Sequence, residues 1–373
     1  MNIAWIIFVL LIIILLQGMI YNKWGLKGIT YKREFKQKTV FEGETIEMVD
    51  QIVNRKLLPI PWIRLESKIS QHLVTEALEN KAGGEEVFHR SLFSLLPYQK
   101  ITRTHHLTAM KRGYYPLDTV SVTTGDAIGF GESFDSIEAS TAVTVYPKIV
   151  AIDEIPLPSH SWLGDISVKR WIIEDPFLHA GVRVYRAGDP LNTINWKATA
   201  RSQKMQVNKK DYTADHHLMI YVNFDTNEDI RLPIENPERL EEALSYAASL
   251  AAYTIEQGIA TGFGCNGYFV EPFTNTLERI KPSIRVGPSS SGSQLDYILD
   301  TIAKVKMDRS RNFRAFLEED IEQELSDTDI ILFTRQVSEK VEQKIAQLEQ
   351  LGNAVEVVLL DQFTEKAGEE YAS

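Results

Sequence analysis

The 373-residue chain contains one cysteine, Cys265, which excludes an internal disulfide framework and a metal site built from several cysteines. So little cysteine is compatible with a reducing compartment. Basic residues are also in deficit, with 40 Lys and Arg against 51 Asp and Glu and a net charge of -11. This acidic balance argues against nucleic acid as the main partner. The contents of 44% hydrophobic and 24% charged residues are those of a globular protein.

Motifs of several well-known active sites are absent. The chain has no G-x-x-x-x-G-K-[ST] phosphate loop, no H-E-x-x-H metal helix and no G-x-S-x-G nucleophile turn. GFGCNG at 262–267 has the spacing G-x-G-x-x-G, but the strand-like YFVEPF follows where dinucleotide binding requires a helix. We therefore expect these glycines to serve a bulge or turn, and Cys265 to be a small core residue.

Charged side chains are missing from the first 22 residues, and positions 3–16 are almost wholly aliphatic or aromatic. About 20 apolar residues in a helix cross the hydrocarbon layer of a membrane. A cleaved signal peptide would have a charged start and a small-residue cleavage site, which this segment lacks. We therefore expect residues 1–22 to be an uncleaved, single-pass anchor. Positive residues that flank a membrane segment prefer the cytoplasmic side. Six such residues follow the anchor, namely Lys23, Lys27, Lys32, Arg33, Lys36 and Lys38. The sequence therefore predicts that the C-terminal domains are cytoplasmic.

Residues 23–150 have the pattern of an antiparallel β-sandwich. Short segments rich in β-branched and aromatic residues are separated by turn residues, and no segment has a long helical period. Many short strands with this spacing favour two packed antiparallel sheets. The clearest strand candidates are TIEMVDQIVN, WIRLESKI, EVFHRSLF and DTVSVTT.

Residues 151–373 hold a conspicuous motif, described below, and then an alternation of strands and helices. Helices are predicted after the cap-like Asn236-Pro237, over 294–306 and over 339–350. The acidic run EEDIEQELSDTD is expected to be a solvated helix. Strands alternating with helices predict a largely parallel, doubly wound sheet. The strand candidates are HLMIYVNFD, ATGFGCNGYFV, DIILFT and AVEVVLLD.

The loop after the first of these strands carries oxygen side chains at alternate positions, Asp225, Asn227 and Asp229. Ligands of open α/β sheets bind in the crevice beyond the carboxyl ends of the strands. Alternating oxygens can turn toward one hard cation, so these residues are candidate metal ligands. A polar loop with an Asx turn is the alternative. The histidine pairs at 105–106 and 216–217 are less suited to a metal, because neighbouring strand side chains point to opposite faces.

The most distinctive combination of charged, turn-forming and aromatic residues in the chain is VRVYRAGDPLNTINWKATAR at 182–201. Asp189-Pro190 has the form of a helix cap followed by a first-turn proline. It predicts a short helix with Ile194 and Ala198 on the inward face, and Trp196 is of a type that packs in a core. Over 182–210 seven basic residues accompany a single acid, and guanidinium groups suit carboxylate or phosphate recognition. No nucleophile or base accompanies them, so both a structural and a docking role stay open.

This stretch, extended as RVYRAGDPLNTINWKATARSQKMQV, resembles the signature of the bacterial membrane-associated proteins catalogued as domain of unknown function 58. The family pattern is an Arg-x-Tyr, a Gly-Asp, an Ile-x-Trp, then Ala-Arg and a short strand. The segments FEGETIEMVDQIVN, KRGYYPLDTVSVTTGDAIGFGE and FDTNED also fall in the family's order. The candidate interaction motif comprises Arg183, Tyr185, Arg186, Gly188, Asp189, Asn195, Trp196, Lys197 and Arg201.

The resemblance implies a von Willebrand factor A-like, Rossmann-like C-terminal domain. It also implies two partners, a MoxR-type AAA+ ATPase and a transglutaminase-like membrane protein, and it brings no enzymatic activity and no cofactor. Two departures from the family matter. Many members have a hairpin of two membrane segments, whereas this chain has one. The Asp-x-Ser-x-Ser motif of factor A domains reads Asp225-x-Asn227-x-Asp229, and the later Thr-Asp-Gly is replaced near Thr334-Arg335, so we expect weak or absent cation binding.

Two hypotheses of different classes follow. The first is a membrane-anchored, non-enzymatic interaction protein that works with the ATPase in a cell-envelope or complex-assembly role. The second is a metal-dependent or hydrolytic enzyme that uses the crevice near Asp225. A catalytic site requires titratable groups that converge on one pocket, so the surroundings of Asp225 and Asp189 distinguish the two hypotheses.

Overall fold

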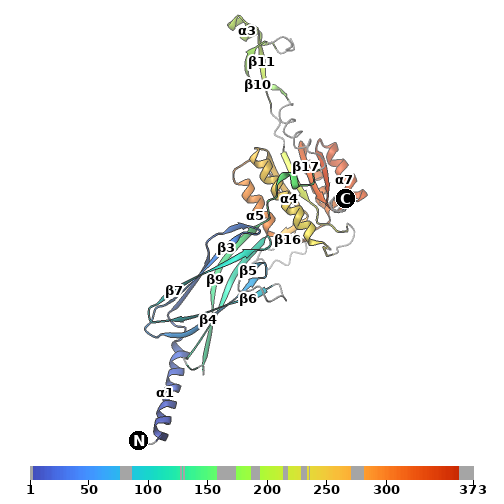
Figure 1. Ribbon diagram of the computed structural model, residues 1–373. Coiled ribbons are helices and arrows are strands. Elements are labelled where there is room, and N and C mark those ends of the chain that lie inside the picture. The colour runs from blue at the N-terminus through green and yellow to red at the C-terminus, as the bar shows by residue number, and fades with distance from the viewer. Residues whose placement is uncertain are drawn as a thin grey trace, which may run out of the picture. The chain divides into compact units, whose positions relative to one another are not determined.

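The computed structural model describes residues 3–75, 86–126, 128, 131–157, 174–185, 194–212, 217–227, 233–234, 236–269 and 281–360. The chain divides into two compact units. Unit 1 comprises residues 1–149 and 299–305, and unit 2 comprises residues 150–298 and 306–373 (Figure 1).

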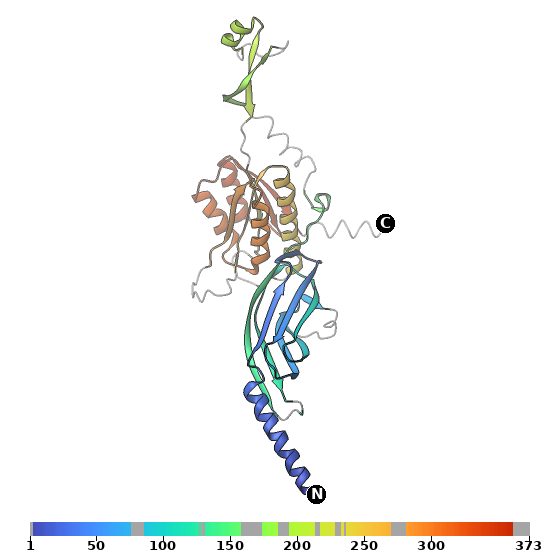
Figure 2. The same cartoon turned by 90° about the vertical axis from the view of Figure 1, so that its left-hand side faces the viewer.

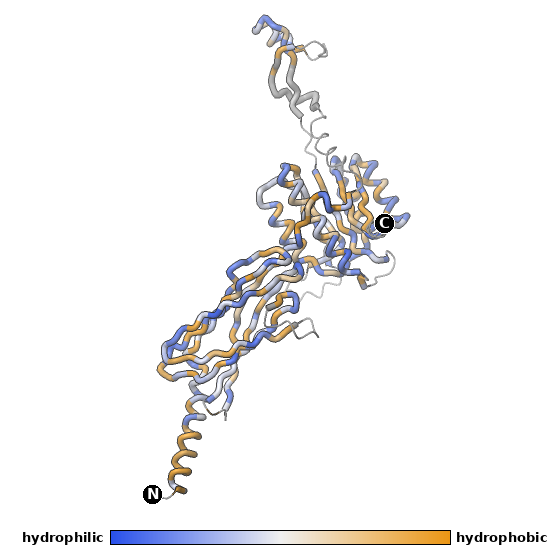
Figure 3. Tube along the Cα trace, in the orientation of Figure 1, coloured by the Kyte–Doolittle hydropathy of each residue, from blue (hydrophilic) through white to orange (hydrophobic). Residues whose placement is uncertain are grey.

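Unit 1 begins with helix α1 (Ile3–Trp24). The 20 residues from Trp5 to Trp24 have a mean hydropathy of 2.3, and this helix is long and apolar enough to cross a membrane. It is the continuous hydrophobic segment at the N-terminal end of the chain in Figure 3. The apolar helix predicted from the sequence is therefore confirmed.

The rest of unit 1 is built almost wholly from strands in two sheets. One sheet has the order β1-β3-β7-β5 and the other the order β2-β9-β8-β4-β6. Neighbouring strands run antiparallel except for β2 and β9, which pair in parallel, so the prediction of purely antiparallel pairing is wrong at this one position. The strands are β1 (Ile29–Phe35), β2 (Thr39–Phe41), β3 (Thr45–Asn54), β4 (Ile60–Ser70), β5 (Leu73–Thr75), β6 (Glu86–Leu95), β7 (Lys100–Ala109), β8 (Gly113–Gly125) and β9 (Glu132–Tyr146).

Alternation along the strands places apolar side chains of both sheets in shared cores. In β3, every second residue from Ile46 to Asn54 is buried. One core joins Ile46 and Met48 of β3 to Val143 and Val145 of β9, which belongs to the other sheet. A second core joins Ile52 of the first sheet to residues of β4, β6 and β8. Burial between the sheets is therefore what holds unit 1 together.

Unit 2 contains a β-hairpin and a larger α/β part. The hairpin pairs β10 (Glu174–Val184) with β11 (Gln206–Tyr212) in antiparallel fashion, and helix α3 (Trp196–Ser202) lies between them in the chain. The α/β part has the sheet order β15-β13-β12-β17-β18. Its strands are β12 (His217–Val222), β13 (Ala260–Cys265), β15 (Ile284–Ser289), β17 (Thr328–Thr334) and β18 (Ala354–Leu359).

The central pairs β12–β13, β12–β17 and β17–β18 are parallel, and β15 is antiparallel to β13 at one edge. The prediction of a largely parallel sheet is therefore confirmed. A separate pair is formed by β14 (Gly267–Phe269) and β16 (Val305–Arg309). The remaining helical elements are η1 (Ile152–Glu154), α4 (Pro237–Glu256), α5 (Gln294–Lys304), α6 (Phe313–Glu322) and α7 (Glu339–Gln350).

Helices lie on both faces of the sheet (Figure 1, Figure 2). Helices α6 and α7 pack in one core with Met219 and Tyr221 of β12. The opposite face carries Phe333, whose ring lies 6.2 Å from that of Tyr246 in α4. Both faces are covered, as a parallel sheet requires, and β17 is accordingly buried along its whole length.

Most helix limits match the sequence pattern. Helix α7 has the predicted bounds, and α4 begins at Pro237 after Asn236. The prediction that the acidic run forms a solvated helix is wrong in two respects. Helix α6 ends at Glu322, and the run ends with the buried Thr328 and Asp329 of β17. The helical part of the run is also not fully solvated. Asp320 of α6 is only 3% exposed and accepts a hydrogen bond of 2.8 Å from Arg285. A half-buried cation on β15 therefore recruits one carboxylate of a run whose composition indicated solvent contact.

Candidate functional site

The motif stretch forms the end of the β10–β11 hairpin together with α3. Strand β10 pairs with β11 through Val184 and Gln206, and the main-chain NH of Tyr185 donates to the carbonyl of Met205 at 2.8 Å. Ile194 makes an isolated bridge with Val207, and both side chains are buried. These contacts hold α3 against the hairpin.

Helix α3 begins later than the sequence predicted. Its cap is Asn195, whose side chain accepts a hydrogen bond of 2.9 Å from the main-chain NH of Ala198. Ile194 was predicted to lie within the helix, but it precedes the cap and pairs as a strand residue. The predicted cap Asp189 lies outside the described residues, as do Arg186 and Gly188 of the motif.

Trp196 is not a core residue. Its side chain is 69% exposed at the first position of α3, which corrects the expectation of a buried ring. The reason is the late helix start, because position 196 becomes the first helical residue, immediately after the cap. Other large apolar side chains of the hairpin are exposed as well, namely Val182, Val184 and Met205.

The described cations of the motif are exposed beside these apolar groups. Lys197 and Arg201 lie on α3, and Lys204 lies in the connection to β11. Arg183 lies in β10, and nothing is described of its side chain. An exposed tryptophan surrounded by cations has the composition of a protein-binding surface, since Trp and Arg are enriched where binding energy concentrates.

The second candidate site is the crevice region predicted near Asp225, at the carboxyl ends of β12, β13 and β17. Asp225, which follows β12, is 7% exposed and accepts hydrogen bonds at both carboxylate oxygens. Oδ1 accepts from Asn266 Nδ2 at 2.9 Å, and Oδ2 accepts from the main-chain NH of Phe313 at 2.7 Å. Asn266 follows β13 and Phe313 begins α6, so one carboxylate ties three elements together.

Arg309 provides a positive charge beside Asp225, which the sequence marked as a candidate metal ligand. Its Nη1 donates to Asp225 Oδ1 at 3.0 Å and to the main-chain carbonyl of Asn227 at 2.6 Å. Burial raises the pKa of the Asp225 carboxyl, and the Phe313 amide and the Arg309 guanidinium act in the opposite direction. The third candidate ligand, Asp229, lies outside the described residues.

Hydroxyl and amide groups near Asp225 are also hydrogen-bonded within the fold. Asn223 Nδ2 donates to Thr334 Oγ1 at 3.1 Å, and Thr334 Oγ1 donates to the carbonyl of Gln336 at 2.8 Å. The Ser310 hydroxyl donates to the main-chain carbonyl of Asn266 at 3.1 Å rather than to a base. These contacts connect strand ends and match no arrangement of nucleophile and base.

We expect divalent cations to bind this crevice weakly or not at all, because a cation would have to displace the buried Arg309 guanidinium from Asp225. Calorimetric titration of the detergent-solubilised chain with Mg²⁺ or Mn²⁺ tests this. A dissociation constant below about 10 µM, roughly -7 kcal/mol, would contradict it. Arg309→Gln is the matched variant, because it removes the competing charge and should bind the cation more tightly than the wild type.

Unit 1 holds a third polar cluster, which the sequence did not indicate. Asp50, His89 and His105 come from three strands, and their potential ligand atoms lie within 4.8 Å of one another. As predicted for adjacent strand residues, His106 is exposed while its neighbour His105 turns inward. Burial and the nearby His105 lower the pKa of His89 to about 4, so this imidazole is neutral at pH 7.

Arg33 determines whether this cluster is suited to a metal ion or to stabilisation of the fold. Its Nε and Nη2 donate to the two oxygens of Asp50 at 2.6 and 2.8 Å, and Arg33 and Asp50 are both almost fully buried. Burial by itself raises the pKa of Asp50, but the hydrogen bonds from Arg33 reverse this and lower it below the usual range. A metal ion bound to Asp50 would lie beside the guanidinium charge, so we assign the cluster to fold stabilisation.

Comparison with known proteins connects the motif to a family. The family model described as "Protein of unknown function DUF58" matches residues 181–345, which confirms the resemblance seen in the motif. The matched range runs from the described end of β10 through the crevice to α7. "Uncharacterized protein YeaD" of Bacillus subtilis (strain 168) is 19% identical over 265 residues, covering 71% of this chain. The chain matches 63% of the length of YeaD, which is less than two thirds.

Solved structures resemble parts of the chain only distantly. The ASH/PapD-like domain of human CEP192 has a TM-score of 0.22 at 11% identity and covers 32% of this chain and 84% of that domain. The CARDB domain of the PF1109 protein from Pyrococcus furiosus has a TM-score of 0.20 at 15% identity, covering 32% of this chain and 96% of that domain. Similarity at this level does not establish a shared fold.

Proposed function

Residues 181–345 are similar to the DUF58 family, and on this premise we propose that the protein is a membrane-anchored, non-enzymatic interaction protein. Helix α1 is the anchor, unit 1 is a β-sandwich, and the α/β part of unit 2 is a von Willebrand factor A-like domain. The end of the β10–β11 hairpin with α3 is the docking surface. Its protein partner is a MoxR-type AAA+ ATPase, with a transglutaminase-like membrane protein as a further member of the assembly.

Sheet topology supports the factor A-like assignment. When the strands of this sheet are numbered along the chain, the order β15-β13-β12-β17-β18 is 3-2-1-4-5. Among the described residues, this matches the first five strands of doubly wound dinucleotide-binding folds. The crevice of such a sheet lies beyond the carboxyl ends of its strands, where Asp225 is located. Because the carboxylate of Asp225 is engaged by Arg309, Asn266 and a main-chain amide, we propose no catalytic role for it.

The exposed ring of Trp196 is the observation that carries the docking proposal. We expect Trp196→Ala to leave the melting temperature nearly unchanged and to weaken partner binding by about 2 kcal/mol, roughly 30-fold in Kd. Lys197→Glu with Lys204→Glu should also weaken binding, and more so at low salt, because both lysines are exposed and would attract an acidic partner. Both effects are measured by binding of the detergent-solubilised chain to a purified MoxR-type ATPase from the same genome, with and without ATP.

The matched control reverses two exposed lysines elsewhere in unit 2, Lys306 and Lys340. This control changes the net charge by the same amount, so it should leave partner binding unaffected. If the Trp196 and Lys197/Lys204 variants unfold while binding per folded molecule stays constant, the motif only stabilises the fold and the docking proposal is wrong.

We further propose that residues 40–373 lie in the cytoplasm, since Lys23 in the last turn of the proposed membrane helix and five basic residues after it form a positive flank. Arg33 is included among these flanking charges although it is buried in the folded protein. The orientation of the membrane helix is set during insertion, before the strands pack. A protease added to intact, wall-stripped cells should leave this region uncut and should digest it after the cells are permeabilised. Digestion in intact cells would reverse the orientation and remove access to a cytoplasmic ATPase.

A further inference from the structure

Several loops at one end of unit 1 carry exposed, large apolar side chains. This end is defined by the backbone contacts that join its loops: Ile29 at the start of β1 pairs with Asn54, and the NH of Asn54 donates to the carbonyl of Gln99. The loop between β3 and β4 and the turn between β6 and β7 therefore lie near one another. The indole NH of Trp62 in β4 donates to the carbonyl of Asp126 at 3.2 Å, which places the end of β8 at the same end of unit 1. The exposed residues are Trp24, Leu57, Leu96, Tyr98, Ile128 and Phe134.

Helix α1 is fixed to the same end by side-chain hydrogen bonds. Lys56 Nζ donates to the carbonyls of Trp24 and Gly25, at 2.6 Å for Gly25, so a cation caps the carboxyl end of the helix. Ser133 Oγ on β9 contacts Asn22 Oδ1 at 2.9 Å. The loop end of unit 1 is therefore continuous with the helix.

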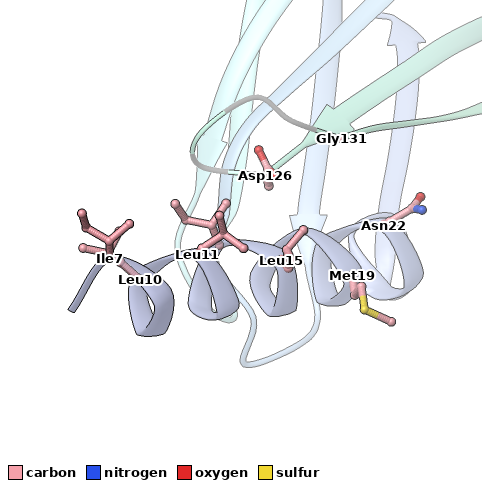
Figure 4. Close-up of a pocket in the computed structure, with 10 residues that line it drawn as sticks. Ile7, Leu10, Leu11, Leu15, Met19, Asn22, Asp126 and Gly131 are labelled. Atoms are coloured by element: carbon pink, nitrogen blue, oxygen red, sulfur yellow. The ribbon is translucent and has the colours of Figure 1, made fainter. Parts of the chain in front are cut away.

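The β8–β9 hairpin extends past the end of α1 and lies along its side. Asp126 and Gly131 line a groove of about 710 Å³ together with Gly18 and apolar residues of α1 (Figure 4). A Cβ atom at Gly18 would lie 3.4 Å from Asp126 Oδ2, so the two segments approach closely there. Gly18 precedes Trp24 by six residues, which is about 9 Å along a helix.

The distance of about 9 Å between Gly18 and Trp24 along α1 indicates which environment surrounds the apolar side chains of these loops. If α1 spans the roughly 30 Å hydrocarbon layer with Trp24 at its boundary, a loop beside Gly18 lies about 9 Å below that boundary. Interfacial segments bury their apolar side chains about 5–10 Å into this zone, and tryptophan and tyrosine are enriched there. Lys23, Lys27 and Arg55 are exposed at the same end and match anionic headgroups. Glu132, exposed at the base of the hairpin tip, limits deeper entry.

We propose that the loop end of unit 1 is a lipid-binding surface, in which Ile128 and the adjoining ends of β8 and β9 enter the headgroup region of an anionic membrane beside α1. The inference rests on the proposed anchoring by α1 and adds a second membrane contact, made by strands and loops. This contact fixes the orientation of unit 1 on the bilayer, where a helix alone would leave the unit free to tilt.

The test places a fluorescent thiol label at one position at a time in the full chain. Cys265 is buried, so the wild-type chain should take up no label under native conditions. Ile128→Cys reports on the hairpin tip, and Met110→Cys is the matched control, because the two residues are 52% and 53% exposed and Met110 lies after β7 at the opposite end of the strands. Leu11→Cys reports on insertion of α1.

The labelled proteins are reconstituted into vesicles of phosphatidylcholine and phosphatidylglycerol with brominated acyl chains, which quench the label. We expect strong quenching at positions 11 and 128, a blue shift of the emission at 128, and neither effect at 110. Quenching at 11 without quenching at 128 would overturn the lipid-binding surface and leave the anchor intact. No quenching at 11 would overturn both the anchor and this inference.

Discussion

Asp50→Ala lowers the free energy of unfolding of unit 1 by about 3–5 kcal/mol, the usual cost of removing one partner from a buried ion pair. The loss is large because Asp50 accepts from Arg33 and from the hydroxyl of Tyr31 at 2.7 Å. Its removal leaves a guanidinium group inside the core with no counter-charge. Native-state hydrogen exchange of the β3 amides, followed against denaturant, measures this energy for unit 1 separately from unit 2.

The same two segments supply the control. Lys36 and Glu47 form an ion pair that is partly exposed to solvent, and such pairs contribute only about 0–1 kcal/mol. Glu47→Ala should therefore change the β3 exchange energy little. The double variant Arg33→Met, Asp50→Leu should recover much of the loss, because it removes both charges. Equal effects of Asp50→Ala and Glu47→Ala would show that the buried pair does not hold the sheets together.

We expect Asp225→Ala to lower the free energy of unfolding of unit 2 by about 3–5 kcal/mol, because it leaves Arg309 buried without its counter-ion. It also leaves the main-chain NH of Phe313 without an acceptor and removes one of the two acceptors of the Asn266 amide, so the loss spreads from β12 to the start of α6. Native-state hydrogen exchange of the β12 main-chain amides, followed against denaturant, measures this loss of unfolding free energy. Glu242→Ala is the control, since Glu242 pairs with Arg239 on the exposed side of α4.

The response to metal distinguishes a structural Asp225 from a metal ligand. If Asp225 acts through Arg309, chelator and Mg²⁺ should leave the wild-type unfolding energy unchanged. A metal ligand would instead make the wild type more stable in Mg²⁺, and Asp225→Ala would abolish that gain. Stabilisation of the wild type alone would therefore restore the hypothesis of a metal-dependent enzyme that uses Asp225.

Features that depend on near neighbours in the chain were predictable. A run of 22 residues without charge predicted the apolar helix α1, and the apolar spacing of residues 339–350 predicted the observed limits of α7. Alternation along a strand separated His105 from His106, and the family match over residues 181–345 followed from the motif. In each case the signal lies within a few residues, where helix period, strand alternation and capping act.

The sequence alone thus determined where α1, α4, α7 and the strands of the parallel sheet lie, because local periodicity and caps select them. Only the tertiary structure determined which charged side chains form ion pairs. Arg309 and Asp225 are 84 residues apart in the chain, and their pairing converts a predicted metal ligand into half of an ion pair. Trp196 was assigned to a core by residue type, but the place where α3 starts left it exposed. A buried charge must find an opposite charge or a hydrogen bond, and the crossing of distant strands and helices determines which one it finds.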